Sequence, residues 1–295
     1  MTTLGAVFLP QLPPERLRSV AAAADAAGLD ELWLWEDCFR EGGLTSAAVA
    51  LAFTSSLRVG IGLLPMPLRN VALTAMEVAT IDRLFPGRLH AGVGHGVLDW
   101  MGQVGSRVDS PLTLMREYVP ALKSLLRGDE VTVSGRYVNL DRVKLDWPPA
   151  GPVPIFAGAE GPKTLRLAGE VADGTILPAG TSPDAVRRAR TLIQQGRSSG
   201  ADTQEHRVIV YVLVATGDRA KERMGVELGR WNLDPSLDVA ITGDASAVAA
   251  GVRRWVDAGA DTVVLQPTVD ADPEQFVDFA GREVQPLVGT SVSSG

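Results

Sequence analysis

Short apolar runs alternate with longer amphipathic segments along almost the whole chain. An apolar run of four to eight residues is typical of a buried strand, and apolar positions spaced three or four apart are typical of a helix with one buried face. The expected strands cover residues 4–9, 31–35, 58–61, 88–92, 155–157, 175–177, 207–214 and 262–265. The expected helices cover residues 15–27, 45–53, 72–84, 112–127, 163–170, 184–195, 220–230 and 245–258. Buried strands separated by helices indicate a parallel sheet.

Eight strand–helix units within 295 residues match a (β/α)8 TIM barrel built as a single domain over residues 1–295. A doubly wound open sheet is the alternative. That fold usually carries a glycine-rich turn after its first strand, and this chain has Leu9-Pro-Gln-Leu-Pro-Pro14 there instead. The pattern therefore favours the barrel.

The alternation is interrupted once, by an insertion at about residues 130–152 after the fourth expected helix. Residues 131–140 form two β-rich arms around Ser134-Gly135, which predicts a hairpin. A proline-rich stretch over residues 147–154 leads back to the strand–helix pattern. At the other end of the chain, we expect a flexible C-terminal tail from about residue 287 to residue 295.

Composition narrows the functional classes. Lys and Arg total 28 against 35 Asp and Glu, giving a net charge of −7 without any basic block, so nucleic acid is not an expected partner. The single cysteine, Cys38, excludes a disulfide framework and a multi-cysteine zinc site, and three histidines leave little material for a metal centre. The start of the chain does not resemble a secretory signal, and no apolar run is long enough to cross a membrane. We expect a cytoplasmic protein that acts on a small molecule.

Reactive groups of a TIM barrel lie at the C-terminal ends of the strands and in the loops that follow. This rule selects residues 35–38, 62–70, 92–100, 158–162, 178–180 and 266–267. The loop Gly158-Ala-Glu-Gly161 opens onto a helix, so its backbone N–H groups could hold a phosphate, although an ordinary tight turn would use the same glycines. The run Gly92-Val-Gly-His-Gly96 would let a flat ligand approach the backbone closely, most of all at Gly94.

Three side chains are candidates for proton transfer. Glu36 and Asp37 are adjacent, so only one of them can point into the barrel mouth, and a loop acid at a helix N-terminus is the alternative role. His95 follows a strand and is a better candidate than His90, which lies within one. Cys38 is expected to be an inert thiol, and no Ser-His-Asp arrangement is present. Trp35 and Trp100 are expected to line an apolar substrate pocket beside His95.

Three stretches resemble a known family, the luciferase-like monooxygenases and coenzyme F420-dependent reductases. They are Gly60–Arg88 with the run to Gly96, then Pro154–Gly174, then Gly243–Leu265. The resemblance covers nearly the whole chain. It implies a TIM barrel, often dimeric, that binds flavin or deazaflavin at its C-terminal mouth.

The resemblance also assigns residues to the cofactor. A bulge after the third strand, often with a non-proline cis peptide, backs the ring in this family, and it falls at Gly62-Leu63 with Leu64 beside it. The family's phosphate site falls on the loop already selected above, at Ala159, Glu160 and Gly161. The expected cofactor-binding residues are therefore Gly62, Leu63, Leu64, Gly94, Ala159, Glu160, Gly161 and Leu177.

Departures from the family pattern matter as well. Many F420 enzymes carry Asp-His after the second strand, where this chain has Glu36-Asp37, so the imidazole that could protonate a substrate is missing. An acidic residue of the family's sugar-phosphate dehydrogenases aligns with Val97, which sets this chain apart from them. The Arg-His-Pro often found after the third strand is Arg69-Asn-Val71.

The sequence therefore predicts an oxidoreductase, a homodimer, that transfers a hydride between F420 and a small organic substrate. FMN is the alternative cofactor, and an FMN-dependent monooxygenase using O2 is the alternative reaction. A non-catalytic flavin-binding protein is the alternative from another class. An aldolase or isomerase is disfavoured because no expected strand ends in lysine.

Overall fold

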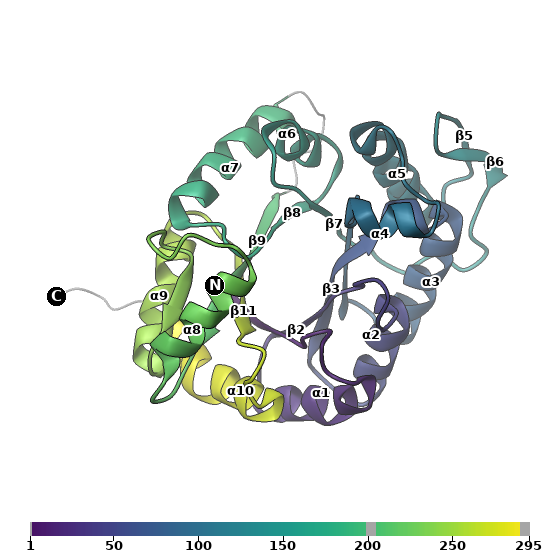
Figure 1. Cartoon of the computed structure of the whole chain (residues 1–295). Coiled ribbons are helices and arrows are strands. Elements are labelled where there is room, and N and C mark those ends of the chain that lie inside the picture. Colours follow the sequence, from purple (N-terminus) through teal and green to yellow (C-terminus); the bar gives the residue numbers. More distant parts are fainter. Residues whose placement is uncertain (1, 199–204, 290–295) are drawn as a thin grey trace.

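A computed structural model describes residues 2–198 and 205–289. Its main sheet is parallel, with the order β10-β9-β11-β1-β2-β3-β4-β7-β8, and β8 pairs in turn with β9. Eight strands therefore close a ring with helices outside it, while β10 is added next to β9 (Figure 1). The predicted (β/α)8 TIM barrel is confirmed.

The strands agree closely with the apolar runs of the sequence. The barrel strands are β1 (Thr3–Val7), β2 (Glu31–Leu34), β3 (Arg58–Pro65), β4 (Leu89–Gly94), β7 (Ile155–Gly158), β8 (Gly174–Leu177), β9 (Arg207–Ala215) and β11 (Thr262–Pro267). The helices that alternate with them are α1 (Leu17–Ala26), α2 (Gly43–Ala52), α3 (Val71–Leu84), α5 (Pro111–Leu126), α6 (Pro162–Val171), α7 (Pro183–Arg197), α8 (Ala220–Arg230) and α9 (Ala245–Asp257).

The remaining elements are short, and the hydrophobic pattern did not indicate most of them. They are the 3-10 turns η1 (Pro14–Arg16) and η2 (Met66–Leu68), α4 (Leu98–Gln103), β10 (Ala240–Thr242), α10 (Pro273–Phe279), the π-helical η3 (Ala280–Val284) and α11 (Gln285–Gly289). The helix α4 has one buried side chain, Met101, so it has no periodicity to detect. Residues 287–289 of the expected tail belong to α11, and residues 290–295 lie outside the described part of the chain.

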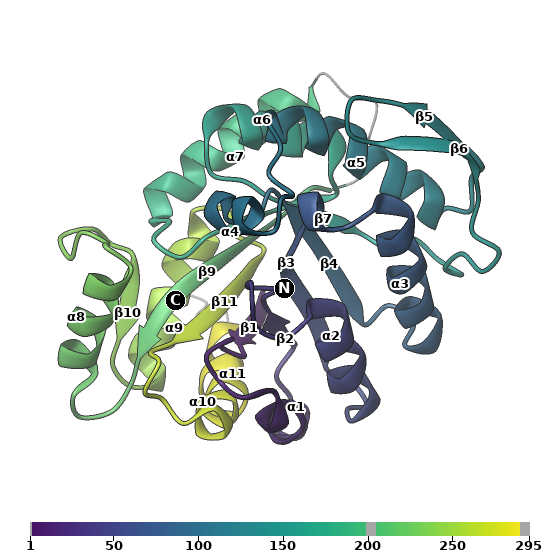
Figure 2. The same cartoon turned by 45° about the vertical axis from the view of Figure 1, so that its right-hand side comes forward.

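The insertion contains the expected hairpin, β5 (Val131–Ser134) paired with β6 (Asn139–Val143), and it projects beside α5 (Figure 2). Its loop spans residues 135–138 rather than a two-residue turn at Ser134-Gly135. The reason is Glu117 of α5, whose carboxylate accepts N–H bonds from Arg136, Tyr137 and Val138. A contact distant in sequence therefore sets the loop.

The barrel interior is filled by large side chains that lie against glycines of neighbouring strands. Trp33 is fully buried, and a Cβ atom added at Gly60 would lie 2.4 Å from its ring. A Cβ atom at Gly62 would lie 2.2 Å from the hydroxyl oxygen of Tyr211. Placing large residues opposite small ones closes the barrel below its mouth.

The N-terminal end of the barrel is closed by a buried ion cluster around Glu31. Its side chain is fully buried, and the indole N–H of Trp33 donates to Oε2 at 2.8 Å. Oε1 lies 3.3 Å from His90 Nε2, and Arg207 and Arg58 approach it at 3.4 and 3.5 Å. Burial alone would raise the pKa of Glu31, but the neighbouring His90, with Arg207 and the Trp33 indole N–H, holds it at about 2.

At the C-terminal end of the barrel, β9 forms an extension of the sheet. The last three residues of β9, from Leu213 to Ala215, pair with β10. Leu213 and Ala215 of this extension pack against α8 in a small separate core. The helices α4 and α8 lie on opposite sides of the barrel opening (Figure 1). No helix in residues 2–198 and 205–289 has the length and hydrophobicity needed to cross a membrane.

Candidate functional site

The floor of the barrel mouth is formed by an irregular segment of β3. The pairing of β3 with β4 shifts register between Ile61 and Leu64, and the Gly62–Leu63 peptide bond is cis. The predicted bulge is therefore present at the predicted residues. A second non-proline cis bond, Cys38–Phe39, follows β2 and was not anticipated.

The Leu63 side chain extends from the bulge across the ends of the next two strands. A Cβ atom added at Gly94 of β4 would lie 2.5 Å from Leu63 Cδ2, and one added at Gly158 of β7 would lie 2.3 Å from it. Glycine is therefore required at both strand ends if Leu63 is to occupy this place. The bulge, Gly94 and Gly158 together form a flat surface of backbone and aliphatic carbon.

Two of the predicted cofactor residues turn their side chains into the core instead of the mouth. The side chains of Leu64 and Leu177 are 1% and 2% exposed and belong to the large hydrophobic core. Gly62, Leu63 and Gly94 remain as the residues that face the mouth together.

The predicted phosphate loop leads directly into α6, where Gly161 is the N-cap residue and Pro162 is the first helical residue. The amide of Ala159 is already used, because it donates to the carbonyl oxygen of Ile176 at 3.1 Å. In the described part of the chain, no acceptor is found for the amides of Glu160, Gly161, Lys163 and Thr164. These N–H groups at a helix N-terminus can bind an anion without a capping side chain.

Glu36 is held in a salt bridge. Arg69 donates through Nε and a terminal nitrogen to the two carboxylate oxygens of Glu36, both at 2.6 Å, and through the other terminal nitrogen to Glu77 at 2.7 Å. The amide of Gly43, the first residue of α2, also donates to Glu36 at 2.7 Å. Both oxygens are therefore engaged, and the geometry favours an anchoring role over proton transfer.

Asp37 has a different environment, although it is the next residue. Its carboxyl group is half-buried and accepts no hydrogen bond from the described residues. Burial raises the pKa of Asp37 above its ordinary value of 3.8, and the charge of Arg40 opposes the shift only in part. Two neighbouring carboxyl groups with such different surroundings are typical of a site that keeps one for proton transfer.

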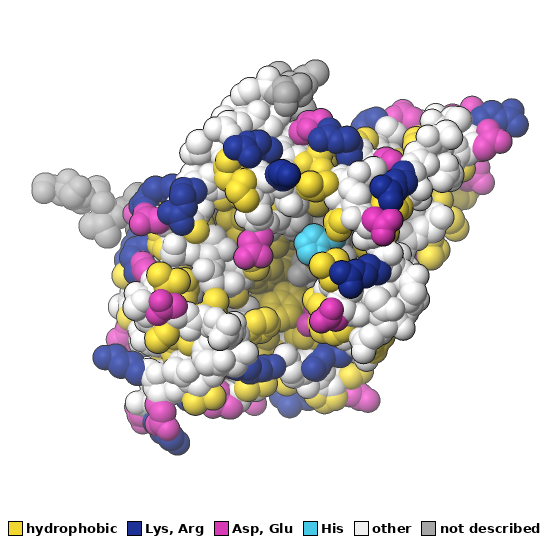
Figure 3. All heavy atoms as spheres, turned by 45° about the horizontal axis from the view of Figure 1, so that its top comes forward, with side chains coloured by type: hydrophobic (Ala, Val, Ile, Leu, Met, Phe, Trp, Pro, Cys, Tyr) yellow, Lys and Arg dark blue, Asp and Glu magenta, His cyan; other side chains and the backbone are white. Residues whose placement is uncertain are grey.

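His95 follows β4 and is exposed. Its Nδ1 lies 2.6 Å from the carbonyl oxygen of Gly96, so Nδ1 carries the hydrogen and Nε2 is the free nitrogen of the neutral ring. A histidine side chain lies at the edge of a hollow in Figure 3, and His90 and His206 are buried. The same view shows hydrophobic side chains at the floor of this hollow and charged groups around it.

Aromatic side chains form one wall of the mouth. Trp35 makes edge-to-face contacts with Tyr211 and Trp231, at ring-centroid distances of 5.7 and 6.3 Å. Trp100 lies on α4, which follows β4, and is half-buried. Sequence reasoning selected Trp35 and Trp100 but missed Tyr211 and Trp231, because their positions depend on how distant strands align.

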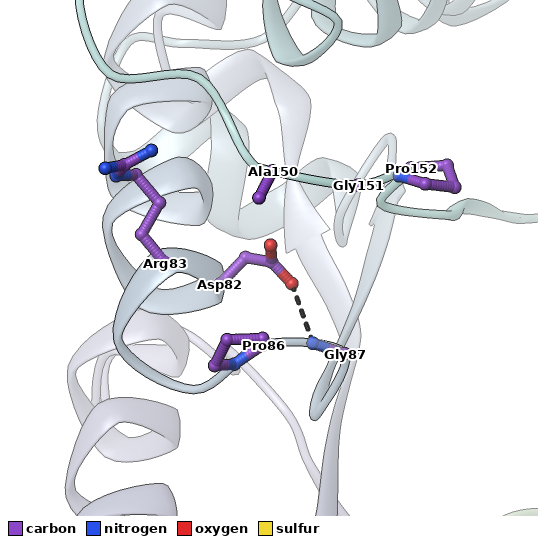
Figure 4. A pocket seen from close by; sticks show the side chains of 7 residues that line it. All are labelled: Asp82, Arg83, Pro86, Gly87, Ala150, Gly151 and Pro152. Carbon is purple, nitrogen blue, oxygen red and sulfur yellow. Dashed lines mark hydrogen bonds between the residues drawn. The ribbon is translucent and has the colours of Figure 1, made fainter.

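A separate pocket of about 390 Å3 lies at the other end of the barrel, between the end of α3 and the segment before β7. It is lined by Asp82, Arg83, Pro86, Gly87 and residues 150–152 (Figure 4). The carboxylate of Asp82 accepts the amide N–H of Gly87 at 3.1 Å, so the acid is used to shape the turn. This pocket is at the stabilising end of the barrel and offers no pair of groups suited to catalysis.

Comparison with known proteins agrees with this geometry. A 5,10-methylenetetrahydromethanopterin reductase of Methanolobus tindarius is 25% identical over 96% of this chain and 99% of its own length. The solved structure of an F420-dependent secondary alcohol dehydrogenase with an F420–acetone adduct superposes with a TM-score of 0.85, at 22% identity, over 97% of this chain and 99% of that one. A type II Baeyer–Villiger monooxygenase from Pseudomonas putida, in complex with FMN, gives a TM-score of 0.78 at 17% identity over 98% and 99%.

The model of one protein family, described as luciferase-like monooxygenase, matches residues 3–278. These residues run from the first barrel strand into α10, so they include the bulge, the loop before α6 and all the mouth residues described above. The resemblance drawn from the sequence is confirmed, and the chain belongs to the luciferase-like monooxygenase family.

Proposed function

We propose that this protein is an oxidoreductase that transfers a hydride between coenzyme F420 and a small organic substrate bound at the barrel mouth. The observation that carries the proposal is the bulge at Gly62-Leu63, with Leu63 lying over Gly94 and Gly158. A flat ring needs such a surface, and side chains larger than hydrogen at the two glycines would collide with Leu63. The reductase from Methanolobus supports an oxidoreductase, and the alcohol dehydrogenase and Baeyer–Villiger monooxygenase structures support F420 or FMN as its cofactor.

The residues of this chain fit a cofactor with a flat ring and a phosphate-bearing tail. The ring would lie against the bulge, and the amides of Glu160, Gly161 and Lys163 at the start of α6 would hold the phosphate. The bound cofactor supplies hydride transfer, which no side chain can perform. The protein contributes the surface that orients the ring and the side chains that surround the substrate.

Asp37 is the proposed proton donor and acceptor for the substrate. Its pKa is raised by burial, and its carboxyl oxygens are free of hydrogen bonds in the described chain. It stands where many F420 enzymes have histidine, so a carboxyl group would replace the imidazole. His95 is the alternative, with Nε2 as the reacting atom.

The proposal is tested by titrating the purified protein with F420 and with FMN, using the visible absorbance of each. We expect micromolar binding of at least one cofactor, followed by oxidation or reduction of a member of a panel of enones, imines, aldehydes and alcohols. Failure of both to bind below millimolar concentration would contradict the proposal. Tight binding without turnover across the panel would favour the non-catalytic alternative.

An FMN-dependent monooxygenase is the second candidate, because an FMN-bound enzyme of this kind shares the fold over nearly the whole chain. Deazaflavin does not activate oxygen as reduced flavin does. Oxygen consumption that depends on substrate and reduced FMN, but not on reduced F420, would select the monooxygenase.

The homodimer remains a proposal, and we place its interface on α2 and α3, which lie side by side on the outside of the barrel (Figure 1). The helix α2 has no charged residue. Val49, Leu73 and Met76 are exposed on these helices, by 40%, 48% and 56%. These exposed apolar side chains can pack against the same side chains of a symmetry copy. Light scattering should show a dimer, and Met76→Glu should give a monomer that still binds cofactor.

The cellular location is also proposed rather than demonstrated. Cys38 is unpaired and half-buried, which a reducing compartment allows, and we place the protein in the cytoplasm. Cell fractionation with an antibody checks this directly.

A further inference from the structure

Buried polar atoms without a hydrogen-bond partner are concentrated at the barrel mouth. In the described part of the chain, seven side chains have such an atom. Two are His90 and His206, at the starts of strands. The other five are at the mouth: Gln11, Trp35, Glu41, Tyr211 and Gln266. Buried polar groups are nearly always paired in folded proteins, so a group of exceptions in one place calls for a ligand.

These groups occupy one half of the ring of strands. Tyr211 is on β9, Gln266 is on β11, Gln11 follows β1, and Trp35 follows β2, and these four strands are consecutive in the ring. The glycines of the flat surface are on the other half, on β3, β4 and β7. The mouth is therefore divided into a polar half and a glycine half.

Gln266 is the clearest of the unpaired groups. Its side chain is 1% exposed, and neither the amide oxygen nor the amide nitrogen has a partner among the residues that the structure describes. Val264, two residues earlier on the same strand, packs in the barrel interior with Tyr211, so alternation directs Gln266 to the interior as well. The residue sits at the C-terminal end of β11, one step nearer the mouth than that layer.

Two of the other four groups, Trp35 and Tyr211, lie together. Burial raises the pKa of the Tyr211 hydroxyl, and the Trp35 indole opposes this rise. The rings of Trp35 and Tyr211 are in edge-to-face contact at 5.7 Å, and both side chains are more than nine-tenths buried. The Tyr211 hydroxyl lies just beneath Gly62, so it also touches the edge of the glycine half. Tyr211 thus stands where the two halves meet.

We propose that Gln266, Tyr211 and Trp35 form a subsite that binds an uncharged hydrogen-bonding group of the substrate, of the amide or carbonyl class. The proposal rests on the proposed function, because it gives the glycine half to the cofactor. An amide, a phenol and an indole N–H offer donors and acceptors but no charge. The nearest cation on the loop after β2, Arg40, is exposed and donates to the carbonyl oxygen of Pro10, and Arg69 is held by two glutamates. Neither of these two arginines of the described chain is therefore free to pair with a phosphate or carboxylate of the substrate.

The test uses benzamide, acetophenone and benzoate as probes, added to the cofactor-loaded protein in a calorimeter. Benzamide, with a donor and an acceptor, should bind at least tenfold more tightly than benzoate. The variant Gln266→Leu should weaken benzamide binding about tenfold, the effect of losing one buried hydrogen bond, and should change acetophenone binding less. The cofactor dissociation constant should not change. Gln275→Leu makes the same replacement on an exposed helix residue and should change none of these values.

Thermal unfolding gives a readout that does not depend on binding. Because the Gln266 amide is buried without a partner, Gln266→Leu should raise Tm by about 2–4 °C. Tyr211→Phe keeps the ring packing and removes one hydroxyl, so it should also raise Tm while weakening benzamide binding. A lower Tm for both variants, with benzamide affinity unchanged, would show that these groups are structural and would overturn the inference.

The two proposals can fail separately. If F420 or FMN binds and Gln266→Leu leaves benzamide affinity unchanged, the polar subsite is wrong and the proposed function stands. If neither cofactor binds, the proposed function is wrong. The assignment of the glycine half to the cofactor and of the polar half to the substrate is then wrong as well. Equal or tighter binding of benzoate would overturn the assignment of an uncharged substrate group.

Discussion

The two ends of this barrel use polar side chains in opposite ways. At the N-terminal end, the carboxylate of Glu31 is surrounded by donors from Trp33, His90 and Arg207, all within the protein. At the C-terminal end, the buried polar atoms of Gln266 and Tyr211 have no partner, and the carboxyl group of Asp37 has none in the described chain. The first end surrounds a buried carboxylate with partners and stabilises the fold, whereas the second leaves a cluster of polar groups open to ligands.

The largest expected effect separates the two carboxyl groups at the mouth. Asp37→Asn should lower kcat about 10²- to 10⁴-fold, the usual contribution of a general acid or base, with little change in Tm. Because the pKa of Asp37 is raised, the rate of substrate protonation should fall as pH rises through that pKa. The variant should lose this dependence. The measurement is a pH–rate profile of both proteins.

The control is Asp99→Asn, the same replacement at an exposed acid in the first turn of α4, at the same end of the barrel. If Asp99→Asn lost as much activity as Asp37→Asn, the assignment to Asp37 would be contradicted. A loss confined to a His95→Gln variant would select the imidazole instead.

The next effect concerns the N-terminal end and is one of stability. The pKa of Glu31 is about 2 in the folded protein, against an ordinary value of 4.5, which corresponds to about 3 kcal/mol. Since the folded pKa is the lower one, this contribution is complete above pH 4.5 and is lost as pH falls toward 2. Glu31→Gln should lower the free energy of unfolding by about 3 kcal/mol at neutral pH and flatten its decline in acid, measured by urea unfolding at several pH values.

The matched control for that experiment is Glu170→Gln. Glu170 pairs with Arg116 on the surface, where both side chains are partly exposed. A surface pair contributes little, so we expect a change below about 1 kcal/mol. An equal loss in both variants would mean that the buried cluster is not special.

A smaller effect tests the glycine half of the mouth. Gly158→Ala would place a methyl group 2.3 Å from Leu63 Cδ2, so the leucine side chain must move. We expect cofactor affinity to fall about tenfold, or about 1.4 kcal/mol, with the fold retained. Cofactor titration measures this, and unchanged affinity would argue against the ring lying on this surface.

The smallest effect is expected at a glycine where an added side chain would touch no other residue. Gly225 lies within α8, and a Cβ atom added there would meet nothing within 4 Å. Gly225→Ala should raise stability by about 0.5–1 kcal/mol, the usual difference between the two residues in a helix, and leave cofactor affinity unchanged. Together with Gly158→Ala, it separates glycines kept for the mouth from those that are incidental.

The sequence predicted the barrel well because buried parallel strands produce apolar runs that are easy to detect. The strands β2, β7 and β8 begin and end within one residue of the expected ranges. The pattern missed β10 and α4 because three and six residues are too few to show a period. The bulge was placed correctly through the family resemblance, since a change of register has no signal in the pattern of apolar residues.

The site was predicted less completely, for a physical reason. Glu36 and Asp37 look equivalent in the sequence, and they differ only because Arg69, 33 residues further on, binds the first of them. Similarly, the roles proposed for Tyr211 and Gln266 depend on the pairing of β9 with β11. This pairing brings two residues that are 55 positions apart onto neighbouring strands. The rule that reactive groups lie at strand ends selected residues 266–267, but it gave Gln266 no role, because the unpaired amide depends on the packing around it.

The packing of Leu63 between Gly94 and Gly158 also constrains how this sequence can evolve. A methyl group at either glycine requires the Leu63 side chain to move, because each would lie within 2.5 Å of the same Cδ2 atom. Positions 63, 94 and 158, on three different strands, should therefore change together among homologues. In a lineage with a smaller residue at position 63, side chains at positions 94 and 158 would no longer collide with it. The shape of the mouth could then change.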